Sequence, residues 1–204
     1  HAMLPSVEVC NMALAHLGQA PMVQSVNPPD DSWYAGMCVS LWPLAVDSLL
    51  ELHPWGFTTR TAELARIVEQ RPGWGFCYVP PADSVRLWAV SSAADCAEPT
   101  DWELQAGIPN VTPQIICTNT AQAFARYTIN NTVPQIMPPL FKTALSYHLA
   151  ALLAGPVIKG EAGMNVAKAM LQFAQMHAQR AAASDANQQR TTREHIPGWI
   201  KDRA

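Results

Sequence analysis

Two carboxylates in the first quarter of the chain have the spacing of an acid–base pair. Asp47 and Glu51 are four residues apart within an apolar run, so a helix would place both on one face. Paired carboxylates hydrolyse glycosidic bonds when one acts as the acid and the other as the base or nucleophile. A hydrolase of cell-wall glycan is therefore one function class that the residues leave open, although no pocket can be inferred from the spacing.

The other ionisable residues favour structural roles. His53 precedes Pro54 at a predicted helix end and is interpreted as a cap. Asp30-Asp31 could bind a cation, but capping of the following helix explains the pair better. Three histidines fall on or beside apolar helix faces, where packing is the more common role: His16, His148 and His177.

Motifs for nucleophilic, nucleotide and metal chemistry are missing. The chain has no Gly-x-Ser-x-Gly elbow, and Gly73-Trp74-Gly75 lacks the Lys-Ser/Thr pair of a phosphate loop. The five cysteines form no Cys-x-x-Cys pair, which indicates reduced, mostly buried thiols rather than zinc ligands. We therefore predict that the protein is not an enzyme and has no catalytic, cofactor-binding or metal-binding residues.

The composition is poor in charge. Charged residues make up only 14% of the 204 residues, where about 25% is ordinary, and the chain also carries seven Trp and eight Met. Large apolar patches usually mark a partner surface, so we expect much of the surface to be covered in an assembly. The alternative is a neutral monomer that exposes many Ala, Ser, Thr, Gln and Asn side chains.

Charge is also uneven along the chain. The first 59 residues hold five carboxylates and no Lys or Arg, whereas residues 138–204 hold eight basic and four acidic groups. Arg190 and Arg193 could contact DNA phosphates, which leaves open a DNA-binding module in the C-terminal third. The net charge of −3 and a pI near 6.0 argue against a dedicated nucleic-acid binder. No secretory signal or span of about 18 apolar residues is visible, so we expect synthesis in the cytoplasm and no membrane partner.

Helical periodicity appears in two blocks. Ser6 is placed to cap a first helix over about 6–17, and Asp30 or Asp31 a second that ends at His53-Pro54. Pro43 lies inside the second helix and should bend it. A third helix begins near Pro138-Pro139 and breaks at Gly155-Pro156, and a fourth covers about 161–183.

Between these blocks, from about 56 to 133, short β-rich runs alternate with Pro and Gly. This pattern predicts a small antiparallel sheet or barrel. Ile108 is placed in a turn, and residues 62–65 are consistent with either helix or strand. The predicted strands cover 57–59, 75–79, 85–90, 102–105, 114–118 and 125–129.

The predicted fold class is α+β. About four helices form a bundle from residues 4–56 and 134–183, and a small antiparallel β lobe, residues 57–133, is inserted between helices 2 and 3. Residues 184–204 are polar and are predicted to form a flexible C-terminal tail.

The stretch 41–60 carries the most specific motif, which consists of Trp42-Pro43, Asp47, Leu49-Leu50, His53-Pro54-Trp55, Phe57 and Arg60. It resembles the tail tubular protein A family of podoviruses, the head-to-tail adaptor proteins of short-tailed bacteriophages. Val46 and Thr58 depart from the usual Arg and Ala of that family. Residues 9–18 resemble the opening helix of the family, and weaker likenesses follow at 78–87 and 141–150.

The resemblance implies a structural protein of the virion. Members are thought to form a ring of about twelve copies between the portal protein and the tail nozzle protein, through which DNA passes without specific binding. Residues 184–204 would order on docking to the portal, with aromatic and apolar side chains as anchors. The candidate portal-docking residues are Arg190, Arg193, Ile196, Trp199 and Ile200.

Overall fold

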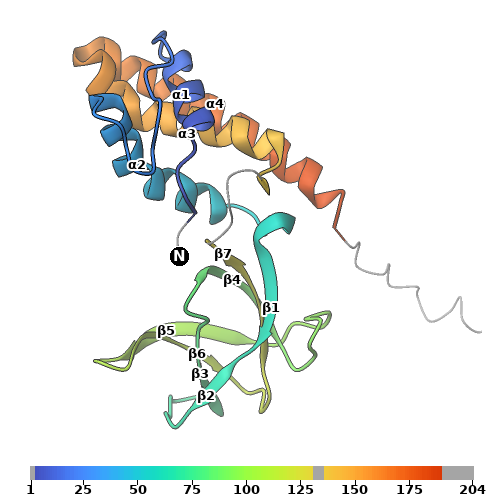
Figure 1. Cartoon of the computed structure of the whole chain (residues 1–204). Coiled ribbons are helices and arrows are strands. Elements are labelled where there is room, and N and C mark those ends of the chain that lie inside the picture. The colour runs from blue at the N-terminus through green and yellow to red at the C-terminus, as the bar shows by residue number, and fades with distance from the viewer. Residues whose placement is uncertain (1–2, 131–135, 190–204) are drawn as a thin grey trace, which may run out of the picture.

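The computed structural model describes residues 3–130 and 136–189. Its helices gather at one end of the molecule and its strands at the other (Figure 1). The helices are α1 (Val7–His16), α2 (Trp33–Leu50), the short 3₁₀ helix η1 (Gly56–Thr58), α3 (Pro139–Ile158) and α4 (Gly160–Ala186). The strands are β1 (Thr59–Glu63), β2 (Ala65–Ile67), β3 (Phe76–Val79), β4 (Ser84–Ser91), β5 (Trp102–Ile108), β6 (Thr112–Thr118) and β7 (Phe124–Ile129).

The first two helices each begin at a serine. The Ser6 hydroxyl accepts a hydrogen bond from the Val9 amide, as predicted, and the Ser32 hydroxyl accepts one from Ala35. The prediction that Asp30 or Asp31 caps α2 is therefore wrong. Asp30 instead accepts hydrogen bonds from the Ser32 and Gln24 amides, at 2.8 and 2.7 Å, which orders the preceding loop. Hydrogen bonds from Ser32 and then Gln24 hold the pKa of Asp30 well below its ordinary value.

The helices enclose one apolar core with α3 at its centre. Phe141, Leu145, Leu149 and Leu153 of α3 are fully buried, and each such side chain contributes about 1.5–3 kcal/mol on burial. Trp42 of α2 is also buried, and its indole donates to the Met3 carbonyl. Among the described residues α3 is the one helix long and apolar enough to cross a membrane, and packing in this core explains its composition.

The predicted fold class is wrong in its β part. In place of one small lobe, seven strands form two antiparallel sheets, three-stranded β1-β7-β4 and four-stranded β2-β3-β6-β5. The strands precede α3 and α4 in the chain and form a body with its own core. Short apolar runs between Pro and Gly reveal strands, but the partner of each strand is set by contacts that are distant in sequence.

The two sheets share a core and meet along one continuous stretch of chain. β1 passes into β2 through the buried Leu64, so residues 62–65 are strand or strand junction and not helix. Tyr78, Leu87, Ile116 and Tyr127 pack between the sheets. On the other face of the four-stranded sheet, Cys77, Ile115 and Cys117 form a smaller cluster.

Several predicted element ends also need correction. Residues 56–58 form a 3₁₀ turn, so the first strand begins at Thr59 and not at Phe57. Ile108 is the last residue of β5, not a turn residue, because it pairs with Thr112 across the β5–β6 hairpin. Pro43 lies inside α2 as predicted, but α2 ends at Leu50, before His53-Pro54.

The break between α3 and α4 lies later than predicted. α3 continues past Gly155-Pro156 to Ile158, because the buried Leu153 and Ala154 hold this turn in the core. The chain then reverses at Lys159, whose φ of 63° and ψ of 161° belong to a region that only glycine adopts readily. α4 runs on to Ala186, so the first residues of the predicted tail are helical.

Candidate functional site

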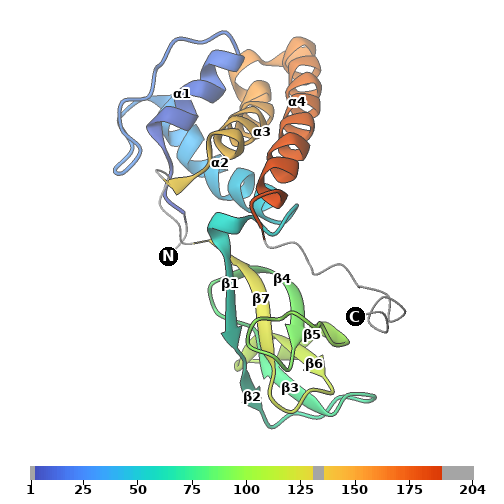
Figure 2. The same cartoon turned by 90° about the vertical axis from the view of Figure 1, so that its right-hand side faces the viewer.

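The motif segment His53-Pro54-Trp55 lies where the helices meet the strands, between α2 and η1 (Figure 2). Trp55 is 1% exposed, and its indole donates to the Leu49 carbonyl at 3.0 Å. The Trp55 ring meets Phe141 of α3 edge-on, with centroids 5.0 Å apart. The conspicuous tryptophan of the motif thus closes the end of the helical core.

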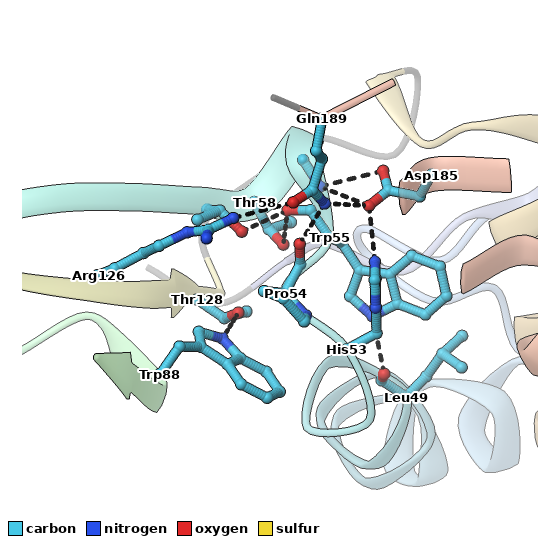
Figure 3. A network of polar contacts seen from close by, with 12 residues as sticks. Leu49, His53, Pro54, Trp55, Thr58, Trp88, Arg126, Thr128, Asp185 and Gln189 are labelled. Atoms are coloured by element: carbon cyan, nitrogen blue, oxygen red, sulfur yellow. Dashed lines mark hydrogen bonds and ion pairs between the residues drawn. The ribbon is translucent and has the colours of Figure 1, made fainter. Parts of the chain in front are cut away.

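Asp185, near the end of α4, accepts hydrogen bonds from polar groups of this segment (Figure 3). Its Oδ2 lies 2.8 Å from His53 Nε2, and because a carboxylate can only accept, the imidazole donates. The Gly56 amide donates to the same carboxylate, with both distances 3.1 Å. The prediction that His53 caps α2 is wrong: its ring binds a carboxylate 132 residues further along the chain.

Gln189 extends this network from the helices to the strands. Its side-chain amide donates to the Pro54 carbonyl at 2.8 Å and to Asp185 at 2.6 Å. The side-chain oxygen of Gln189, Oε1, accepts a hydrogen bond from the Arg126 guanidinium of β7 at 2.9 Å. One side chain at the end of the described chain therefore connects α4, the motif segment and the three-stranded sheet. We call Asp185, Gln189, Arg126 and residues 53–56 the junction.

Further polar contacts join the two parts beside the junction. Arg86 of β4 donates to the Glu51 carbonyl at 2.7 Å, and its guanidinium lies 4.5 Å from the ring centroid of Trp88. The Trp88 indole donates to Thr128 of β7 at 2.8 Å. Arg86 therefore ties the end of α2 to the outer face of the sheet.

Asp47 and Glu51, the candidate hydrolase pair, have different roles in the structure. Asp47 accepts a hydrogen bond from the side-chain amide of Asn130, whose Oδ1 in turn accepts one from the Met3 backbone amide. Burial, and next the Glu51 charge, raise the pKa of Asp47. Glu51 is exposed just beyond α2, and neither residue lines a described cavity. The geometry favours a structural role for Asp47 at the boundary between helices and strands.

The remaining histidines pack against helices. His16 and His177 stack on the two faces of Tyr147, with centroid distances of 3.8 and 4.7 Å. His148 lines a depression between α2, α3 and α4, where burial lowers its pKa. Within residues 3–130 and 136–189, no group of three or more His, Cys, Asp or Glu side chains could hold a metal ion.

The candidate portal-docking residues lie outside the described part of the chain. Arg190, Arg193, Ile196, Trp199 and Ile200 all follow Gln189, the last described residue. Sequence reasoning singled out His53 and Trp55 but missed Asp185, Gln189 and Arg126. A motif rich in His, Pro and Trp signals a packed segment, but it carries no information about its partners far along the chain.

Neither the models of known protein families nor the curated protein sequences give a match to this chain. The resemblance of residues 41–60 to podovirus adaptor proteins therefore stays a prediction, which is taken up as a proposal below.

Proposed function

We propose that this protein is a structural head-to-tail adaptor of a short-tailed bacteriophage. It assembles as a ring of about twelve copies between the portal protein and the tail nozzle protein, and DNA passes through the ring during ejection. It is made in the cytoplasm of the host bacterium and is incorporated into the virion. This function requires interfaces rather than a catalytic centre.

The strongest support is the apolar and charge-poor outer surface of the helices. α4 carries four charged residues in 27, where ordinary composition would give about seven. Four of its large apolar side chains are nevertheless exposed: Met164, Leu171, Phe173 and Met176. A charge-poor helix with exposed Met, Leu and Phe is typical of a surface that a second protein covers.

A second apolar area lies between α2 and α4. Leu44, Ser48 and Leu52 follow one another at four-residue spacing and so share one side of the chain at α2. Leu52, which is 65% exposed, lines with Leu171 a depression of about 170 Å³. Leu44, Leu52 and Leu171, which we call the bundle patch, fit an apolar side chain of a neighbouring subunit.

The charge distribution is compatible with passage of DNA. With a net charge of −3, the subunit as a whole does not attract phosphates, which suits a lumen through which DNA slides. The junction also supports the proposal, because the motif that resembles the adaptor family binds the end of α4, just before residues 190–204 in the chain.

The test is assembly with the portal protein of the same virus. We expect the purified chain to co-migrate with the portal on size exclusion at micromolar concentration and to form rings in electron micrographs. Leu52→Glu, which places a charge in the bundle patch, should abolish the rings. Val68→Glu is the matched control, because Val68 is fully exposed in the β2–β3 loop, away from the helices. Absence of co-migration for the unmodified chain would contradict the proposal.

The role of the C-terminal segment is tested separately. Trp199→Ala combined with Ile200→Ala should weaken binding to the portal while leaving the fold of residues 3–189 unchanged. Full infectivity of particles built with a chain truncated after Gln189 would remove portal docking from the proposal.

A further inference from the structure

The two sheets leave one side of the β body open. β4 is an edge strand of the three-stranded sheet, and β5 is an edge strand of the four-stranded sheet. The Thr100 amide, two residues before β5, donates to the Val90 carbonyl of β4 at 2.7 Å in an isolated bridge. Apart from this bridge, the outer edges of β4 and β5 have no strand partner among the described residues.

A groove of about 430 Å³ lies between these edges, within the range of about 300–1,000 Å³ typical of binding clefts. We call it the seam. Ser84–Trp88 of β4 form one wall, and Trp102 and Leu104 of β5 form much of the other. An extended polypeptide suits such a place, because its backbone can pair with an open strand edge while its side chains enter the groove.

The end of the described chain lies close to the seam. Gln189 is held by Arg126 of β7, and Arg126 lies next to Ala89 of β4 across the sheet. Trp88 lines the seam, and Figure 3 shows it near the motif segment that Gln189 contacts. Trp199 follows Gln189 by ten residues, which can span up to about 35 Å when extended. The β4 edge is only about 5 Å, one strand spacing, beyond β7.

The charge and the apolar side chains of residues 190–204 complement those of the β body and the seam. Residues 190–204 hold four basic and two acidic groups, whereas residues 59–129 hold five basic and seven acidic groups. Glu103 of β5 faces away from the seam, toward Trp74, so this opposite charge acts between the segment and the β body as a whole. The segment offers Ile196, Trp199 and Ile200 to a groove with two tryptophans and two leucines in its walls.

We propose that residues 190–204 dock in the seam of their own chain, with Trp199 and Ile200 against the apolar side chains of β4 and β5. The occupant is the same chain because Gln189 delivers it beside the groove, at an effective concentration that does not depend on protein concentration. This inference concerns the free subunit and does not rest on the proposed function. On docking to another protein, the same side chains would leave the seam.

Limited trypsin cleavage of the full chain, followed by mass spectrometry, tests the proposal. Leu104→Glu places a charge in the seam at a side chain that is already 38% exposed. We expect cleavage after Arg193 to become about tenfold faster in this variant, which corresponds to a loss of ~1.4 kcal/mol in the free energy of docking. Val68→Glu, outside the seam, should cleave at the unmodified rate. Equal rates in all three chains would overturn the proposal.

Hydrogen exchange gives a second measurement that does not alter the described fold. The outer edges of β4 and β5 should exchange slowly in the unmodified chain and faster in the Trp199→Ala, Ile200→Ala variant. The protection should be unchanged on dilution, since the occupant belongs to the same molecule. Protection that disappears on dilution would assign the seam to a second copy and overturn the proposal. Because no portal is present, the result is independent of the assembly test.

Discussion

The Asp185 carboxylate accepts hydrogen bonds from three places in the chain: His53, the Gly56 amide and Gln189. Its side chain is only 12% exposed, so water cannot fully replace these partners. Hydrogen bonds to a charged group contribute about 1.5–3 kcal/mol each when formed, and orphaned buried partners add to the cost of losing them. Asp185 therefore matters more for stability than its place near a helix end suggests.

We expect Asp185→Asn to lower the free energy of unfolding by about 1–3 kcal/mol, because the amide keeps the shape but loses the charge and one acceptor. Urea denaturation monitored by circular dichroism measures the change. Gln179→Ala is the control on the same helix, because Gln179 is exposed, and it should stay within about 0.5 kcal/mol of the unmodified chain. Equal effects of the two substitutions would contradict the role of Asp185.

His148 makes stability depend on pH. Burial lowers its pKa in the folded chain, so the unfolded chain takes up a proton first as the pH falls below about 6.5. The free energy of unfolding should therefore fall with decreasing pH, by at most about 1.4 kcal/mol per pH unit from this residue. His16 adds in the same direction, because burial and then the His177 charge lower its pKa.

The measurement is urea denaturation at a series of pH values from 8 down to 5. His148→Gln should reduce the slope below pH 6.5 relative to the unmodified chain, whereas the two slopes should agree above pH 7.5, where both histidines are neutral. An unchanged slope in the variant would show that His148 does not titrate differently on folding.

At the scale of elements, the β5–β6 hairpin depends on one glycine. A Cβ added to Gly107 would lie 1.9 Å from the Thr112 carbonyl oxygen and 2.6 Å from the Pro113 carbonyl carbon. Both are backbone atoms of the facing strand, so no side chain can move to make room. Gly107 is thus required by the close approach of β5 and β6.

We expect Gly107→Ala to destabilise the protein by about 1–3 kcal/mol through this overlap. Gly36→Ala in α2 is the matched control, and we expect it to stabilise the protein. Nothing lies within 4 Å of the added Cβ, and alanine is more favourable than glycine in a helix by about 0.5–1 kcal/mol. Thermal unfolding of the two variants measures both. A neutral Gly107→Ala would contradict the described hairpin.

Features of the elements that depend on nearby residues can be predicted from the sequence. The Ser6 cap, Pro43 within α2 and the start of α3 at Pro138-Pro139 depend on neighbours within a few residues, and the sequence predicts them correctly. The continuation of α3 through Pro156 was missed, because burial of Leu153 outweighs the local cost of proline.

Pairings between distant segments lie beyond such reasoning. β1 pairs with β7 at Thr59–Thr128, and β5 pairs with β6 instead of joining β4, although no local pattern distinguishes these partners. The junction is a case of the same kind, since His53 and Asp185 are 132 residues apart. The motif around Trp55 marked one side of the junction, but the other side lies in an alanine-rich helix end without any distinctive pattern.

For the whole molecule, the contact between Gln189 and Arg126 couples helices to strands. We expect a double-mutant cycle of Gln189→Ala and Arg126→Ala to give a coupling energy of about 0.5–1.5 kcal/mol in urea unfolding. A cycle of Gln189→Ala with Arg60→Ala is the control and should give none, because Arg60 on β1 faces Asp83 at 3.8 Å. Equal coupling in the two cycles would contradict a specific link through Arg126.

The single-residue reversal at Lys159 has a consequence at the far end of α4. Asp185 lies roughly 38 Å from this reversal along a helix that turns about 100° per residue. No loop separates α3 from α4, so a change in the length of the connection cannot be accommodated there. The direction in which the Asp185 side chain points around the helix axis therefore depends on the number of residues in the connection. Adding or deleting one residue there would swing the carboxylate about a quarter turn away from His53, so the spacing between α3 and α4 tolerates no change in length.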